Sequence, residues 1–139
     1  MYKFRIVPLL MLFLSNISYA ADNKFDKKQI YELKTLCGKS AFEYYERNKL
    51  CDGHGNYTSH YNVRLNSCFI YMMASCKADK DSEMFWAEDL IDVNENKVIA
   101  TYLGDNKLIG KRPAMCMVEK KECKNLGEFK ELIKPYMNE

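Results

Sequence analysis

The chain has 139 residues, of which 47% are hydrophobic and 29% are charged, with 21 basic residues against 19 acidic ones. This balance argues against a nucleic-acid-binding protein, because such proteins carry an excess or a stripe of Lys and Arg. Basic and acidic residues are also interspersed, as in VEKKECKNLGEFKEL near the C-terminus. We therefore expect no nucleic-acid partner.

The first 20 residues have the pattern of a secretory signal peptide. Lys3 and Arg5 precede the apolar run 6–14, and small residues lead up to Ala20. The run is shorter than the roughly 20 residues that span a bilayer. We predict cleavage after Ala20, which removes two of the 21 basic residues and leaves no formal net charge. Residues 21–139 should form a single exported domain, periplasmic or secreted, without a stable membrane anchor.

A helix is predicted from Lys27, because Asp26 and Gln29 form a capping box directly before an amphipathic segment. Gly53 is expected to end this helix. Its apolar residues recur at helical spacing and should face the core: Ile30, Leu33, Cys37, Ala41, Tyr44 and Tyr45.

From Tyr57 the hydrophobic period changes to two, which predicts a half-buried strand that runs to Leu65. The segment CFIYMMA that follows is apolar at consecutive positions, as is typical of a central strand. Asn66 and Ser67, between these strands, should form a hairpin turn or a β-bulge.

The second half of the chain predicts a further hairpin, in which DVNEN separates residues 86–91 from residues 97–103. AMCMVEKKEC adds a short strand and a turn. Asn125 and Glu128 then form a second capping pair before a closing helix. The order predicts an α+β fold: a small disulfide-bonded domain with an N-terminal helix, an antiparallel sheet of three to five strands and a C-terminal helix. We expect both helices on one face of the sheet.

The run YTSHYNVRLNSCFIYM, with Cys37 upstream and MCMVEKKECKNLGEFKELIKPYM at the end, resembles a group of small exported proteins of Gram-negative bacteria whose function is uncharacterised. The resemblance covers most of the chain after the signal peptide and implies no particular activity. Cys51 and Cys76 stand outside the pattern of that group.

The six cysteines predict three disulfides, because an even number in a small exported domain indicates a disulfide framework. Cys68 and Cys76 lie on one predicted strand, about 26 Å apart at ~3.3 Å per residue, so they cannot bond to each other. Two bridges between the first helix and this strand are geometrically reasonable.

The pairing of these bridges depends on the turn at Asn66. With the turn, Cys37 would pair with Cys68 and Cys51 with Cys76, whereas without it the two pairs would be exchanged. In either case the remaining two cysteines, Cys116 and Cys123, close a short loop before the last helix.

Residues 50–62, LCDGHGNYTSHYN, contain both histidines of the chain. Cysteine and histidine are common zinc ligands, so four residues form a possible zinc site: Cys51, His54, His60 and Cys68. The spacing C-x2-H-x5-H-x7-C, however, matches no common structural zinc pattern, and an oxidising compartment favours disulfides over thiolate ligands. We therefore expect neither a metal nor a cofactor.

The sequence lacks a G-x-S-x-G elbow, a C-x-x-C redox motif and a C-x-x-C-H haem motif. Four carboxylates could be considered for glycoside cleavage, but in a charge-rich chain such residues are more often solvated: Glu83, Glu88, Asp89 and Asp92. We therefore expect that the protein is not an enzyme. The alternative is a small hydrolase or metal-dependent enzyme that uses His54 and His60.

The segment GNYTSHY combines aromatic and small polar residues beside a cross-link, which makes it a pre-organised surface for a partner protein. Tyr57 and His60 are predicted to contact that partner, and the alternative is that both pack the start of the strand. The predicted function is a non-enzymatic exported interaction module, compatible with an inhibitor, an immunity protein or an effector. A third possibility is a sheet-face pocket for a small ligand or peptidoglycan fragment.

Overall fold

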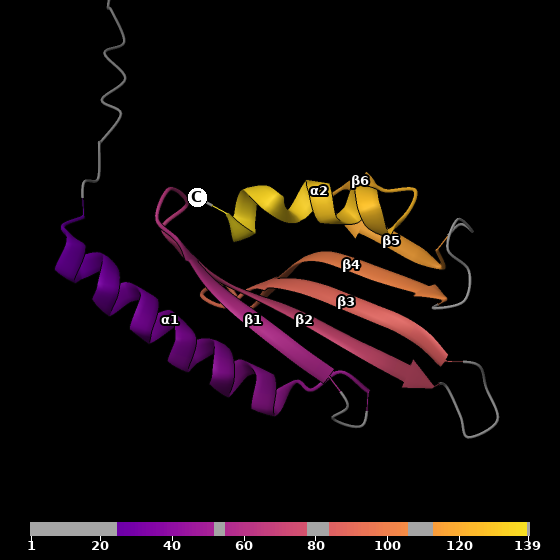
Figure 1. Ribbon diagram of the computed structural model, residues 1–139, viewed down its shortest axis with the longest axis horizontal. Helices are drawn as coiled ribbons and strands as arrows, with labels where there is room; N and C mark the ends of the chain where they lie inside the picture. The colour runs from indigo at the N-terminus through magenta and orange to yellow at the C-terminus, as the bar shows by residue number, and fades with distance from the viewer. Residues whose placement is uncertain (1–24, 52–54, 78–83, 106–112, 139) are drawn as a thin grey trace, which may run out of the picture.

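The computed structural model describes residues 25–51, 55–77, 84–105 and 113–138. Six strands form one antiparallel sheet in sequence order, from β1 at one edge to β6 at the other (Figure 1). The elements are α1 (Lys27–Arg47), β1 (Gly55–Asn62), β2 (Ser67–Lys77), β3 (Met84–Asp92), β4 (Lys97–Asp105), β5 (Met115–Val118), β6 (Lys121–Glu122) and α2 (Leu126–Met137).

The α+β fold is confirmed, with one strand more than expected. The segment AMCMVEKKEC forms both β5 and the two-residue β6, which pair around a tight turn in which Glu119 has a positive φ of 53°. The predicted signal peptide, together with His54 and Glu83, lies outside the described residues.

The first helix begins where predicted, because both bonds of the capping box form. Asp26 Oδ1 accepts from the N–H of Gln29 at 2.8 Å, and Gln29 Oε1 accepts from the N–H of Asp26 at 2.9 Å. The prediction that the helix continues to Gly53 is wrong, since α1 ends at Arg47. Asn48 caps it with its backbone and side-chain N–H groups on the carbonyl of Tyr44, at 3.0 and 2.9 Å.

The two helices pack on opposite faces of the sheet, so the prediction of a shared face is wrong. β2 is buried on both sides, and its alternate residues contact different helices. Ile70 and Met72 pack against Ala41 of α1, whereas Phe69 lies in the cluster around Phe129 of α2. Figure 1 shows α1 and α2 separated by the sheet.

The C-terminal end of α2 is fixed to the sheet by Asn62, which is fully buried at the end of β1. Its Nδ2 donates to the backbone carbonyls of Pro135, Tyr136 and Asn138 at 3.0, 3.1 and 3.2 Å. Its Oδ1 accepts from the N–H of Leu65 at 3.0 Å. One buried amide therefore satisfies carbonyls at the end of α2 and closes the β1–β2 turn.

All six cysteines are disulfide-bonded, in the pairs Cys37–Cys68, Cys51–Cys76 and Cys116–Cys123. The first two pairs are those expected for a turn at Asn66. That turn forms over residues 63–66, with Asn66 at a positive φ of 49°, and it makes β2 run back beside α1.

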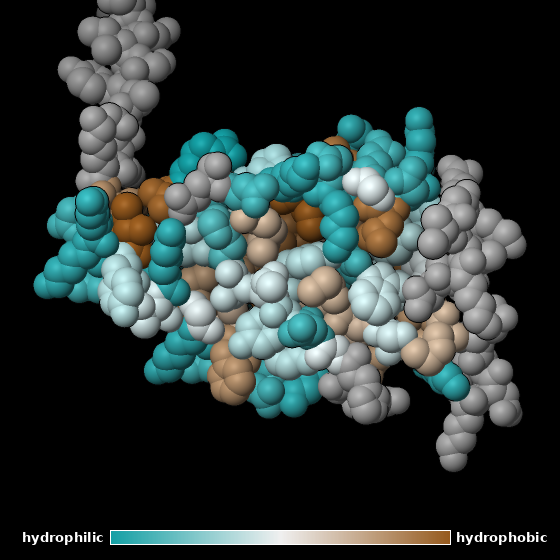
Figure 2. Space-filling view, in the orientation of Figure 1, coloured by the Kyte–Doolittle hydropathy of each residue, from teal (hydrophilic) through white to brown (hydrophobic). Residues whose placement is uncertain are grey.

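None of the described helices is long and apolar enough to cross a membrane. Figure 2 shows hydrophilic and neutral side chains over most of one side of the molecule, with hydrophobic side chains in small separate patches.

Candidate functional site: an open face beside the first helix

The side of the sheet that carries α1 is only partly covered. A helix is about 10 Å wide and strands lie about 4.8 Å apart, so one helix covers roughly two strands. α1 packs on β1 and β2. No other described helix lies on this side, and we call the uncovered surface on β3–β6 the open face. The side chains on this side of β3–β6 include Ala87, Asp89, Val98, Thr101, Leu103, Met115, Met117 and Glu122, of which Ala87 is buried in a cluster with Ala74 and Cys76.

The strand register places these residues on the open face. A β-bulge at Leu90/Ile91 turns Ile99 toward the α2 side, where it is buried, and leaves Val98 opposite Ile91. Val98 is 56% exposed and Met115 is 46% exposed. The open face therefore presents large apolar side chains to solvent at two separate strands.

A groove of about 690 Å³ lies between α1 and the β3–β4 turn. Its apolar lining includes Leu33, Leu36, Tyr44 and Val93, and its polar residues include Glu43 and Arg47. Leu36 is 60% exposed although it lies on the groove side of α1. A volume of this size is typical of ligand or peptide pockets.

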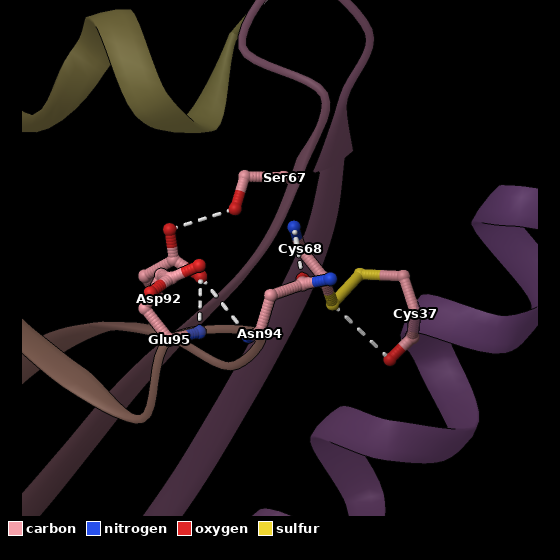
Figure 3. Close-up of a disulfide and its surroundings, with 6 residues drawn as sticks. All are labelled: Cys37, Ser67, Cys68, Asp92, Asn94 and Glu95. Carbon is pink, nitrogen blue, oxygen red and sulfur yellow. Dashed lines mark hydrogen bonds between the residues drawn. A yellow bond between two sulfur atoms is a disulfide. The ribbon is translucent and has the colours of Figure 1, made fainter.

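The walls of the groove are held in place by covalent and polar contacts (Figure 3). The Cys37–Cys68 disulfide joins α1 to β2. Asp92 Oδ1 accepts from the N–H of Asn94 at 3.0 Å, and Asn94 Oδ1 accepts from the N–H of Cys68 at 2.9 Å. Because the turn is bonded to β2 and α1 is cross-linked to the same strand, the groove is pre-organised.

Asp89 is the charged residue of β3 on the open face. Its Oδ1 accepts from Thr101 Oγ1 at 2.7 Å, and burial raises the pKa of the Asp89 carboxyl above its usual 3.8. Burial, together with the negative charge of Asp89, raises the pKa of Tyr44, which lines the groove. The charge of Asp89 on the open face therefore influences the ionisation of Tyr44 in the groove.

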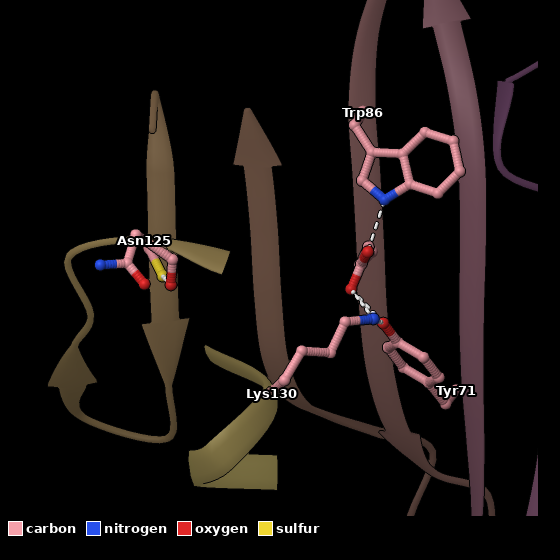
Figure 4. Close-up of polar contacts among 6 residues, drawn as sticks. Tyr71, Trp86, Asn125 and Lys130 are labelled. Atoms are coloured by element: carbon pink, nitrogen blue, oxygen red, sulfur yellow. Dashed lines mark hydrogen bonds and ion pairs between the residues drawn. The ribbon is translucent and has the colours of Figure 1, made fainter. Parts of the chain in front are cut away.

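The opposite side of β3 carries a second carboxylate, Glu88, which is 1% exposed. Its Oε1 accepts from Trp86 Nε1 at 2.5 Å, and its Oε2 accepts from Tyr71 Oη and forms an ion pair of 2.7 Å with Lys130 Nζ. Figure 4 shows the side chains of Trp86, Tyr71 and Lys130, which these contacts bring together. Lys130 also donates to Tyr71 Oη.

This buried cluster resembles an acid–base site, but its geometry favours a structural role. Both oxygens of Glu88 are occupied by donors from the protein itself, and the pKa of Tyr71 is raised by burial and by Glu88. Lys130 belongs to α2, so the cluster fastens this helix to the sheet. We interpret the contacts among Tyr71, Trp86, Glu88 and Lys130 as structural contacts that hold α2 on the sheet, and we call them the latch.

The predicted contact residues Tyr57 and His60 lie within β1, in the segment predicted to be a strand, and they point to opposite faces of the sheet. Tyr57 is half-buried and stacks on Tyr45 of α1, with ring centroids 4.6 Å apart. His60 is also half-buried and pairs in register with Phe69, which faces α2. These positions favour the alternative that both residues pack the strand, and a shared contact surface stays a prediction.

Among the described residues, no group of three or more His, Cys, Asp or Glu side chains is placed to hold a metal ion. Cys51 and Cys68 of the considered zinc set are in disulfides with other partners. Comparison with protein-family models, with curated proteins and with solved structures found no match.

Sequence reasoning did not identify the open face. One available signal was the pattern of DLIDVNENKVIATYL, in which the adjacent residues Ile99 and Ala100 are both apolar. A β-bulge there turns both toward the α2 side and leaves Val98 and Thr101 on the other side. The other was the number of strands, because a sheet wider than two strands exceeds what a single helix covers.

Proposed function

We propose that this protein is an exported, non-enzymatic interaction module that binds another protein on the open face and in the adjoining groove. The observation that carries the proposal is the set of exposed apolar side chains on this side of the sheet: Leu36 in the groove, Val98 on β4 and Met115 on β5. Exposed apolar surface rimmed by polar residues is typical of protein-binding sites.

The framework supports this role. Three disulfides hold a small domain in one conformation and are typical of an oxidising compartment. A surface that is already ordered loses little conformational entropy on binding. An inhibitor, an immunity protein and a secreted effector would all use such a surface.

Site-specific photo-crosslinking tests the proposal. A benzophenone amino acid is placed at Leu36 or Val98, and at two controls away from the open face, Tyr31 and Met84, which are 72% and 41% exposed. In cells that export the protein, Leu36 and Val98 should give one discrete adduct, and mass spectrometry identifies the partner. Adducts from the controls alone, or from no position, would contradict the proposal.

A further inference from the structure

The charged side chains on the described part of the open face are all acidic. The strand register aligns one row across β3 to β6: Asp89 opposite Thr101, Thr101 opposite Met117, and Met117 opposite Glu122. The neighbouring row is apolar, with Ala87 opposite Leu103 and Leu103 opposite Met115. Ala87 is buried, so Leu103 and Met115 are the members of this row that reach the surface. This surface therefore presents an apolar floor with a carboxylate at each end of one row.

Among the residues that the structure describes, Asp89 has no cationic partner, whereas its neighbour Glu88 has one. Glu88 pairs with Lys130 on the α2 side. Within the described ranges, Asp89 forms no ion pair, and the one hydrogen bond that its side chain accepts comes from Thr101. A carboxylate has room for about four hydrogen bonds. Asp89 therefore retains acceptor capacity on a half-buried surface, where an added cation would interact more strongly than in water.

We infer that the open face binds a basic segment of the partner protein, with an Arg or Lys side chain placed against the carboxylate of Asp89. This inference rests on the proposed function and specifies the chemistry of the partner. The aliphatic part of an Arg or Lys side chain packs on apolar surface while its charged end reaches an acceptor. Leu103 and Met117 supply that surface beside Asp89, and methionine adapts its shape readily.

The distance between Asp89 and the second carboxylate, Glu122, sets the spacing of the basic residues in the partner segment. Asp89 and Glu122 are separated by three strand intervals, about 14 Å at ~4.8 Å per interval. Four residues of an extended peptide span about the same distance at ~3.4 Å per residue. An extended segment that crosses the strands can therefore place basic residues at positions i and i+4 against the two carboxylates. Both basic side chains then lie on the same side of the segment.

The test uses the peptide Gly-Arg-Ser-Leu-Ser-Arg-Gly and two matched peptides in which Gln or Glu replaces both Arg residues. Binding to the isotope-labelled protein is followed by amide chemical shifts. The Arg peptide should shift amides at Asp89, Thr101 and Met117 and bind at least about tenfold more tightly than the Gln peptide, since a hydrogen bond to a charged group contributes on the order of 1.5–3 kcal/mol. The Glu peptide should not bind.

The matched variants are Asp89→Asn, Glu122→Gln and, as a control on α2, Glu131→Gln, whose side chain is 68% exposed. Asp89→Asn should weaken binding of the Arg peptide about tenfold, Glu122→Gln about twofold, and Glu131→Gln not at all. Asn keeps an oxygen that accepts from Thr101, so the fold is retained.

Equal affinity of the Arg and Gln peptides, shifts confined to other surfaces, or unchanged affinity of Asp89→Asn would each overturn the inference. These outcomes differ from failure of the proposed function. If the adducts at Leu36 and Val98 form while Asp89→Asn has no effect on peptide binding, the docking surface stands and its preference for a basic segment does not.

Discussion

Two adjacent carboxylates on β3 illustrate how the environment assigns different roles to similar residues. Glu88 points to the α2 side, is almost fully buried and receives three donors. Asp89 points to the open face, is half-buried and receives one donor from the described residues, Thr101. Burial of a charge is tolerated when partners compensate for lost hydration, so we expect that removing a partner of Glu88 destabilises the fold and that neutralising Asp89 does not.

Removal of Lys130 should therefore destabilise the protein. Lys130→Met leaves the buried carboxylate of Glu88 with two neutral donors, and we expect a loss of about 2 kcal/mol. This loss is smaller than the loss expected when one partner of a fully buried ion pair is removed, because the Lys130 side chain is 38% exposed. The matched control on the same helix, Lys134→Met, breaks an exposed pair with Glu131 and should cost less than about 0.5 kcal/mol.

Urea denaturation of the two variants measures the difference. Equal destabilisation by Lys130→Met and Lys134→Met would show that the Glu88 cluster is not a latch. A double variant, Glu88→Gln with Lys130→Met, should recover part of the loss because the uncompensated charge is removed.

Asp89→Asn should have the opposite effect on stability. Because burial raises the pKa of Asp89 in the folded state, ionisation disfavours folding, and this penalty develops as the pH rises through the folded-state pKa. Asn carries no charge. The melting temperature of Asp89→Asn should exceed that of the wild type by a few degrees at pH 7 and match it below about pH 3, where both forms are neutral.

Thermal melts from pH 2.5 to pH 7 test this expectation, with Glu122→Gln as an exposed control whose melting temperature should not change. A lower melting temperature of Asp89→Asn at pH 7 would mean that the carboxylate stabilises the fold. A variant that gains stability and loses peptide binding has the signature of a residue kept for function.

At the scale of elements, local signals predicted where helices and strands begin but not how they assemble. The capping box at Asp26 located the start of α1, since both of its bonds are local. Its end was missed, because the chain leaves the helix at Asn48 and Cys51 then adopts a positive φ of 45° before joining Cys76 of β2. Such a long-range constraint leaves no helical signal in the sequence.

The arrangement of the helices was missed for a related reason. CFIYMMA is apolar on both faces, which predicts a central strand but does not state which helix covers each face. The β-bulge at Leu90/Ile91, which places Val98 on the open face, also lacks a signal such as Gly or Pro at that point of the sequence. The candidate site depends on both features, so the strand number and the pattern of DLIDVNENKVIATYL hint at an open face but do not place its side chains.

The three disulfides should contribute unequally to stability. In the chain-entropy model, loops of 31 and 25 residues stabilise by roughly 3.5–4 kcal/mol, and a loop of seven residues by roughly 2 kcal/mol. Replacing Cys37 and Cys68 by Ala should therefore lower the free energy of unfolding more than replacing Cys116 and Cys123.

Denaturant titration of the two double variants provides the comparison, and thiol titration of the unfolded wild type should detect no free thiol. Two or more free thiols would contradict the three-bridge framework. A larger loss for the Cys116 and Cys123 variant would show that native-state contacts at the start of α2 outweigh loop entropy.

At the scale of the whole molecule, the two sides of the sheet differ in how far they are closed. On the α2 side, aromatic and aliphatic residues of β2, β3 and β4 pack with Phe129 and Ile133 into a continuous core. On the other side, α1 is cross-linked over the first two strands and leaves β3 to β6 to the open face. One side therefore maintains the fold, and we propose that the other side binds the partner.

A lysine scan of exposed apolar residues distinguishes binding through the open face and the groove from binding through any other surface. Leu36, Val98 and Met115 border the groove or lie on the open face, whereas Tyr31, Phe42 and Met84 are comparably exposed and lie elsewhere. Each is replaced by Lys, and the affinity for the cross-linked partner is measured beside the melting temperature. Our account predicts at least about a tenfold loss of affinity for the first three and none for the others, with all six folded. Equal effects in both sets, or losses confined to the second set, would contradict it.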